Sequence, residues 1–176
     1  MQYAMYCENG HRIDFVDPNT GERQARYIGD FHAQLLDVDA DGNPIPLPKF
    51  CADCGAKTMS KCHGCSAHIQ YNEYKVHFVP NYCTACGEPF PWVTTALQEL
   101  GRVTDEAEEL TGEEKAALKR AYPELTKNTP KTSGAVETLK RYYTKFSPGA
   151  VSVLRAVLIN VLTDESKQGL GSLFHK

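Results

Sequence analysis

Eight potential metal ligands occur in the first half of the chain, in four closely spaced pairs. Six of the seven cysteines form three C-x-x-C pairs, and the seventh stands four residues before a histidine. The pairs are Cys7 and His11, Cys51 and Cys54, Cys62 and Cys65, and Cys83 and Cys86. Two thiolates on a tight turn converge on one ion, and two such pairs complete the tetrahedral site that Zn²⁺ prefers. Eight ligands therefore predict two zinc ions, and the odd number of cysteines is explained.

The order of the pairs favours a sequential assignment to the two ions. Only 17 residues separate Cys65 from Cys83, which is typical of a zinc ribbon, whereas 39 residues separate His11 from Cys51. Residues 50–55 and 82–87 share an aromatic residue, a C-x-x-C pair and a glycine that can adopt positive φ. We therefore expect one site from the first two pairs and another from the last two. A compact site from the two middle pairs and an interleaved arrangement are the alternatives.

The same residues argue against redox or catalytic chemistry. A thioredoxin-like C-x-x-C lies between a strand and a helix, whereas these pairs recur among glycines and prolines. A catalytic zinc needs an open coordination position, and eight protein ligands for two ions leave none. No Ser/His/Asp arrangement, phosphate-binding loop or suitable pair of carboxylates is visible in the sequence. We therefore predict structural zinc and no enzymatic activity.

The remaining histidines are weaker ligand candidates. His63 and His68 lie in and just beyond the third pair, and either could replace His11, although their spacing fits less well. His32, His77 and His175 have no partner pattern. We therefore retain His11 as the eighth ligand.

The cysteine content also bears on the compartment. Residues 1–6 contain neither a basic cluster nor an apolar segment, so no secretory signal is visible. The most apolar stretch, residues 150–162, is too short and too polar to span a bilayer. We therefore expect a cytoplasmic protein without membrane contact, in which paired cysteines bind metal rather than form disulfides.

The segments around the ligand pairs have the character of strands and turns. Residues 13–16 and 25–28 flank a turn-rich stretch, which predicts a β-hairpin within an inserted region at 12–50. Prolines alternate at 44, 46 and 48, which favours an extended approach to Cys51. Residues 68–71 and 74–79 are predicted strands of the second ribbon.

After residue 92 the pattern becomes helical. Apolar residues recur every three or four positions over 93–110, and Thr111 begins a capping box for a short helix that Pro123 should end. Ser133 is expected to cap a third helix, and Ser147 with Pro148 to open an apolar fourth one through Leu162. A last short helix is predicted at residues 163–174. The fold class is therefore α+β, with two zinc ribbons in residues 1–91 and a small helical bundle in 92–176.

Charge is distributed unevenly between these halves. Residues 1–91 carry 7 basic and 11 acidic side chains, a poor composition for binding phosphate. Residues 99–114 hold seven acids and one base, whereas 115–145 hold eight bases and two acids. The eight are Lys115, Lys119, Arg120, Lys127, Lys131, Lys140, Arg141 and Lys145. They could contact nucleic acid or an acidic partner, but a solvated face beside an acidic one explains them better, since no groove-reading motif accompanies them.

The ligand segments resemble a known family. The segments are CENGH at 7–11, FCADCGAKT at 50–58, CHGC at 62–65 and YCTACGEPFPW at 82–92. They are similar to the bacterial uncharacterised zinc-ribbon family DUF2321, and TPKT at 129–132 extends the resemblance into the helical half. His63 and Gly64 depart from the proline-containing turn expected there, but no ligand is lost. The resemblance implies a zinc-binding cytosolic protein without an established activity.

These observations together predict a protein-interaction or adaptor module with two structural zinc ions. The alternative is a nucleic-acid-associated factor that binds through residues 115–145. The apolar helix expected at 148–162 is also compatible with a homodimer.

Overall fold

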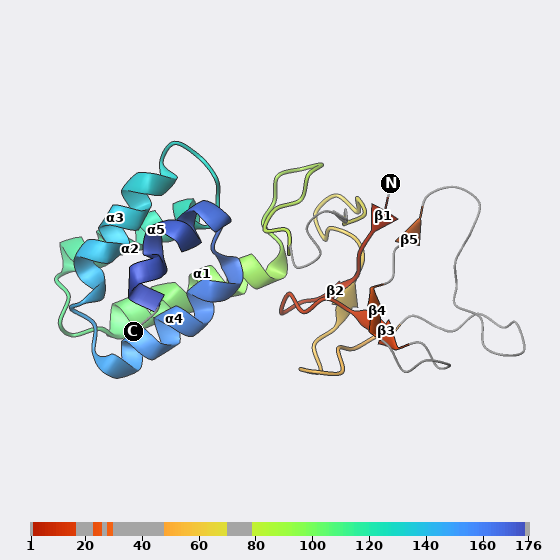
Figure 1. Ribbon diagram of the computed structural model, residues 1–176, viewed down its shortest axis with the longest axis horizontal. Helices are drawn as coiled ribbons and strands as arrows, with labels where there is room; N and C mark the ends of the chain where they lie inside the picture. Colours follow the sequence, from red (N-terminus) through yellow and green to blue (C-terminus); the bar gives the residue numbers. More distant parts are fainter. Residues whose placement is uncertain (1, 17–22, 26–27, 30–47, 70–78, 175–176) are drawn as a thin grey trace, which may run out of the picture. The chain divides into compact units, whose positions relative to one another are not determined.

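The computed structural model describes residues 2–16, 23–25, 28–29, 48–69 and 79–174 (Figure 1). Within these residues six short strands are followed by five helices, which confirms the predicted α+β class. The chain divides into two compact units, Met1–Pro91 and Trp92–Lys176.

The strands of the first unit form three separate antiparallel pairs. β1 (Gln2–Tyr3) pairs with β5 (Ile28–Gly29), and β3 (Asp14–Val16) pairs with β4 (Arg23–Ala25). The third pair joins β2 (Tyr6–Cys7) to β6 (Thr58–Met59), with Tyr6 opposite Met59 and Cys7 opposite Thr58. Residues 6–7 and 58–59 are thus neighbours although some 50 positions apart, which matters for the ligands beside them.

The predicted hairpin is present, but its second strand is shifted. The prediction placed that strand at 25–28, whereas the pairing with β3 runs from Arg23 opposite Val16 to Ala25 opposite Asp14. Residues 28–29 pair with β1 instead. The predicted strands of the second ribbon fall mostly on residues 70–78, which lie outside the described residues, as do 44–47 of the proline-rich approach.

The first two helices largely follow the sequence pattern. α1 is Pro91–Glu106, and α2 is Gly112–Leu125. The capping box is confirmed: the backbone N–H of Glu114 donates to the Thr111 hydroxyl at 3.3 Å, and that of Thr111 donates to the Glu114 carboxylate at 3.0 Å. The prediction that Pro123 ends the helix is wrong, because α2 continues to Leu125. A proline this near the end removes few helical hydrogen bonds, and the fully buried Leu125 holds the last turn.

The third helix starts differently from the prediction. α3 is Thr132–Tyr143, so Ser133 lies inside it rather than at its N-cap. Thr132 organises the start instead: its hydroxyl donates to the Lys127 carbonyl at 2.8 Å and accepts from the backbone N–H of Thr129 at 3.0 Å. The residue type at position 133 could not reveal this, because the start of the helix depends on bonds between Thr132 and the preceding loop.

The last two helices begin at side-chain caps. α4 is Pro148–Val161, with Pro148 in the first turn and the Ser147 hydroxyl accepting from the Ala150 N–H at 3.4 Å, as predicted. α5 is Asp164–Phe174, and the Thr163 hydroxyl accepts from the Ser166 N–H at 3.2 Å.

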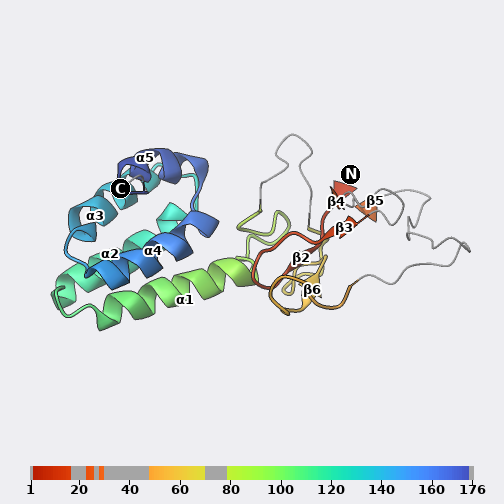
Figure 2. The same ribbon diagram turned by 60° about the horizontal axis from the view of Figure 1, so that its bottom comes forward.

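The helices of the second unit enclose one apolar core. α3 packs against both α2 and α5, and α4 runs beside α1 (Figure 2). Fully buried leucines come from every helix: Leu100, Leu118, Leu125, Leu139, Leu154, Leu158 and Leu170. This unit therefore has a core of its own that contains no metal ligand.

Candidate metal centres

The first ligand pair lies on a tight turn at the end of β2. The backbone N–H of Cys7 donates to the His11 carbonyl at 2.9 Å, and that of Gly10 donates back to the Cys7 carbonyl at 2.8 Å. Gly10 has a φ of 81°, a left-handed conformation that favours glycine. The turn thus returns the chain so that His11 lies beside Cys7.

The second pair occupies a turn of the same design. The Cys51 N–H donates to the Ala56 carbonyl at 2.8 Å, and the Gly55 N–H donates to the Cys51 carbonyl at 2.9 Å. Gly55 has the positive φ, 70°, expected from the sequence. Because β6 follows this turn and pairs with β2, the two turns face each other.

The other two pairs repeat this pattern. The Cys62 carbonyl accepts a hydrogen bond of 2.9 Å from the backbone N–H of Ser66, and the Cys83 carbonyl accepts one of 2.9 Å from that of Gly87. Gly87 has a φ of 77°, again as expected, whereas Ser66 takes 60° without being a glycine. The sequence held a signal for Ser66, since it occupies the position that Gly55 and Gly87 fill in the other C-x-x-C turns.

The structure groups the eight side chains into two sets of four. One set is Cys7, His11, Cys51 and Cys54, and the other is Cys62, Cys65, Cys83 and Cys86. Within each set the ligand atoms lie within 4.8 Å of one another. This is the sequential grouping. Neither the compact nor the interleaved alternative occurs among the described residues.

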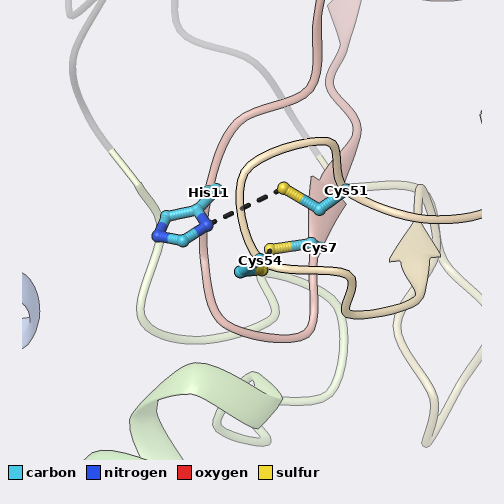
Figure 3. A group of neighbouring side chains, drawn as sticks. All are labelled: Cys7, His11, Cys51 and Cys54. Carbon is cyan, nitrogen blue, oxygen red and sulfur yellow. Dashed lines mark hydrogen bonds between the residues drawn. The ribbon is translucent and has the colours of Figure 1, made fainter.

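Side-chain orientation agrees with this grouping. Figure 3 shows the three sulfurs of the first set and the His11 ring turned toward a common centre. The Cys7 and Cys54 sulfurs are 3.7 Å apart, and the Cys51 sulfur is 3.8 Å from His11 Nδ1. In the second set, the Sγ–Sγ distances are 3.7 Å for Cys62 with Cys86 and 3.7 Å for Cys65 with Cys83.

These distances fit a tetrahedral zinc site. Zn–S bonds of about 2.3 Å at tetrahedral angles place two sulfurs about 3.8 Å apart, and a Zn–N bond shortens the sulfur–nitrogen edge to about 3.6 Å. A disulfide would require about 2.05 Å, and all seven cysteines are free. The donors are soft thiolates with one imidazole, a combination suited to Zn²⁺ rather than to hard cations. Both sets could therefore hold a metal ion, with Cys₃His ligation in the first and Cys₄ ligation in the second.

The thiols of the first set differ in acidity. The backbone N–H of Ala56 and the Asn9 amide, which lies 3.5 Å from the sulfur, lower the pKa of Cys54 to about 6. Burial and the neighbouring thiols raise the pKa of Cys7 to about 11. The Cys54 thiol thus ionises more readily, and the neighbouring Cys7 thiol resists a second negative charge close by. A divalent cation would remove that repulsion.

The second set shows the same division. Burial opposes ionisation of Cys83, but backbone N–H groups, including that of Cys86, outweigh it and lower the pKa of Cys83 to about 7. For Cys86 the Glu88 N–H favours the thiolate, yet burial and the three adjacent thiols prevail and raise the pKa to about 12. A bound divalent cation would offset the repulsion between neighbouring thiolates such as Cys83 and Cys86.

Each set is buried on one side and open on the other. Cys7, Cys51, Cys62 and Cys83 are buried, while the other four ligands are exposed. In the first unit, Cys7 and Cys51 form a small apolar cluster with Met5 and Ile13. The ligands are thus part of the core they would stabilise.

The other histidines take no part in these sets. His63 is exposed, and His68 is half-buried and forms a β-bridge with Lys61. His32, His77 and His175 lie outside the described residues. Among the described side chains, His11 is the histidine that joins a set.

The basic stretch is partly neutralised by acids of the same unit. The pairs are Lys119 with Asp105 at 2.5 Å, Lys145 with Glu114 at 2.6 Å, Lys140 with Glu137 at 2.9 Å and Lys127 with Glu124 at 3.6 Å. Lys115 donates to the Asp105 carbonyl at 2.8 Å. Within the described part of the chain, no acidic partner lies beside Arg120, Lys131 or Arg141. Much of the block thus faces acids rather than forming a continuous cationic surface.

Of the helices described, none is long and apolar enough to cross a membrane. A family model described as an uncharacterised protein conserved in bacteria, DUF2321, matches residues 34–170. No curated protein and no solved structure matches the chain.

Proposed function

Because the chain belongs to the bacterial DUF2321 family, for which no activity is described, we propose a function from its two metal sites. The protein is a cytoplasmic, non-catalytic module in which two structural zinc ions hold the cysteine-rich unit for interaction with another protein. The observation that carries this proposal is the closure of both sites. Each contains four donors at tetrahedral spacing, so a bound zinc has no need of water or substrate as a ligand.

Three further properties support a structural role for the metal. The ligands lie on turns that are fixed by backbone hydrogen bonds, and half of them are buried. The strands described in the first unit are only two or three residues long, so cross-linking by metal would take the place of a larger core. Paired cysteines that remain free of disulfides are typical of a reducing compartment, which supports a cytoplasmic location.

Metal analysis of the purified, reduced protein tests the site count. We expect about two zinc ions per chain in the unmodified protein. Cys51→Ser and Cys83→Ser each remove one ligand from a different site, and each should leave about one zinc. Ser60→Ala, outside both sets, is the matched control and should retain two. A zinc content near zero, or loss of both ions in each cysteine variant, would contradict two independent structural sites.

Nucleic-acid binding through residues 115–145 is the second candidate, although the ion pairs of this stretch reduce the charge available to phosphate. A titration of labelled DNA and RNA at several salt concentrations separates the two proposals. Binding that weakens steeply with salt and is lost in the Arg120→Ala/Arg141→Ala variant would favour nucleic acid over a protein partner.

A further inference from the structure

α4 presents apolar side chains to solvent on one side. Its other side is buried through Leu154, Leu158 and Val161, as the core requires. On the outer side Val153 is 38% exposed and Ile159 is 50% exposed. The two side chains lie six positions apart and so point in different directions around the helix, and of the two Val153 lines the groove beside α4.

Beside this surface lies a groove of about 610 Å³ between α1 and α4. Its base contains the buried Val103 and Ala107, and the half-buried Ala150 and exposed Val153 line the α4 side. All of these residues belong to the helical unit. The groove thus brings the exposed Val153 of α4 next to apolar side chains of α1 and of the residue that follows it.

The edge of the groove is acidic. Glu106, Glu108 and Glu109 line it and are exposed. Arg102 also lines it, but its guanidinium is already bonded to Glu106 at 2.6 Å and to Glu99 at 2.5 Å. Among the described residues, Glu108 and Glu109 have no basic partner. Two unmatched carboxylates therefore border an apolar base.

We propose that this groove binds a basic amphipathic helix of a partner protein. An apolar stripe with a spacing of three and four residues would contact the base, and flanking lysines or arginines would pair with Glu108 and Glu109. The inference rests on the proposed interaction role and supplies the chemistry of the partner. It does not depend on either metal site.

A second copy of the chain fits the groove less well. Of the basic residues on its described helices, most lie on α2 and α3, whose apolar faces are already buried through Leu118, Tyr122 and Leu139. The α4 helix of a second copy is apolar and carries a single basic residue, the half-buried Arg155. None of these three helices combines an exposed apolar stripe with several exposed basic side chains.

The test uses the full-length, zinc-loaded protein and a labelled peptide of about 15 residues, long enough to form a helix. The peptide has leucines on one face and lysines beside them, and a control peptide has glutamates in place of the lysines. Fluorescence anisotropy measures the dissociation constants. We expect saturable binding of the lysine peptide and none of the glutamate peptide.

Variants of the protein then locate the binding surface. Glu108→Lys/Glu109→Lys reverses the edge charge, and Val153→Lys alters the apolar lining. The matched controls are Asp164→Lys/Glu165→Lys, an equal charge change at the start of α5, and Ile159→Lys farther along α4. Each groove variant should weaken binding about tenfold or more, and each control by less than about twofold. Thermal unfolding of every variant checks that the helical unit stays folded.

Three results would overturn the inference. The first is no saturable binding of the lysine peptide, and the second is equal weakening in groove and control variants. The third is a concentration-dependent dimer, seen in sedimentation, that the groove variants abolish, because a second copy would then occupy the site. The zinc content of the same samples separates the two proposals: two zincs without peptide binding reject the groove alone, and missing zinc rejects the metal sites alone.

Discussion

One residue in each of the four ligand turns has a left-handed backbone conformation. Three of these residues are glycines, Gly10, Gly55 and Gly87, whereas the third turn uses Ser66 at a φ of 60°. A side chain costs about 1–2 kcal/mol in this conformation, because its Cβ approaches the following carbonyl. Of the four turns, the third therefore carries backbone strain, at Ser66.

Substitutions of the left-handed residue in two of these turns should have opposite effects on zinc affinity. A Cβ on Gly55 would meet no atom within 4 Å, so Gly55→Ala tests the backbone conformation alone. We expect it to weaken zinc binding at the first site by about tenfold, since metal binding and local folding are coupled. Ser66→Gly should leave binding at the second site unchanged or tighter. Competition with a chromogenic chelator measures both, and unchanged affinity in Gly55→Ala would contradict the role of the positive φ.

At the scale of the elements, α5 approaches α3 at a glycine. A Cβ built on Gly169 would lie 2.9 Å from Val136 Cγ1 and 3.3 Å from Cγ2, closer than packed carbons tolerate. By contrast, Gly101 on α1 has no atom within 4 Å of the corresponding position. Close packing of α5 on α3 therefore requires a glycine at position 169, whereas no packing contact requires one at position 101.

Alanine substitutions should distinguish these two glycines. We expect Gly169→Ala to lower the free energy of unfolding of the helical unit by about 1–3 kcal/mol through overpacking. Gly101→Ala should raise it by about 0.5–1 kcal/mol, because alanine favours the helix. Urea unfolding followed by helical circular dichroism measures both. Adding Val136→Ala to Gly169→Ala should recover part of the loss; if it does not, the overlap with Val136 is not the cause.

α1 and α2 are joined by a buried pair of hydroxyl groups. Thr104 Oγ1 and the Tyr122 hydroxyl are 2.7 Å apart, and Thr104 also donates to the Leu100 carbonyl at 2.8 Å. Burial raises the pKa of Tyr122 to about 12, although the Thr104 hydrogen bond opposes the shift. The folded protein thus keeps this phenol neutral.

The raised pKa predicts a loss of stability in alkaline solution. Because the folded pKa lies above the unfolded value of 10, the neutral phenol contributes fully below pH 10, and the contribution is lost as the pH rises to 12. A pKa difference of about two predicts a full loss of about 2–3 kcal/mol once the pH exceeds the folded pKa, and about half of it should appear at pH 11. Tyr122→Phe should cost about 1 kcal/mol at pH 7 through the lost hydrogen bond, but remove this part of the alkaline loss. Urea unfolding midpoints at pH 7 and pH 11 test this, and an equal alkaline loss in Tyr122→Phe would be inconsistent with it.

At the scale of the whole molecule, the two units rely on different sources of stability. The second unit has a continuous apolar core that includes leucines from all five helices. The small cluster of Met5, Cys7, Ile13 and Cys51 in the first unit includes two of the proposed ligands. Metal should therefore be essential for the first unit and not for the second.

Removing the metal from the intact chain tests this difference. With a chelator and a reductant present, we expect amide resonances of the first unit to collapse to unfolded positions in two-dimensional NMR. The circular dichroism of the helices at 222 nm should persist, and added zinc should restore the resonances. Loss of the helical signal on chelation would show that the second unit also depends on metal.

Several parts of this protein could be predicted because they depend on neighbouring residues. The close spacing of each ligand pair, the capping box at Thr111 and the start of α4 at Ser147 arise from interactions within a few positions of the chain. The charge pattern likewise anticipated that much of the basic stretch would meet acids. The shifted strand at 23–25 and the extension of α2 past Pro123 did not follow, since they depend on pairing with β3 and on burial of Leu125 in the core. The start of α3 at Thr132 did not follow either, because it depends on the conformation of the loop that brings Lys127 and Thr129 to the Thr132 hydroxyl.

The sequence by itself determined that four ligand pairs exist and that their donors suit zinc, because residue type and short spacing fix that chemistry. Only the tertiary structure decided which pairs lie together, because the pairing of β2 with β6 brings Cys7 and His11 to Cys51 and Cys54 across about 40 residues. It also decided that an apolar groove with an acidic edge forms beside α4. Such a surface requires two helices at a fixed separation, which no single segment of sequence encodes.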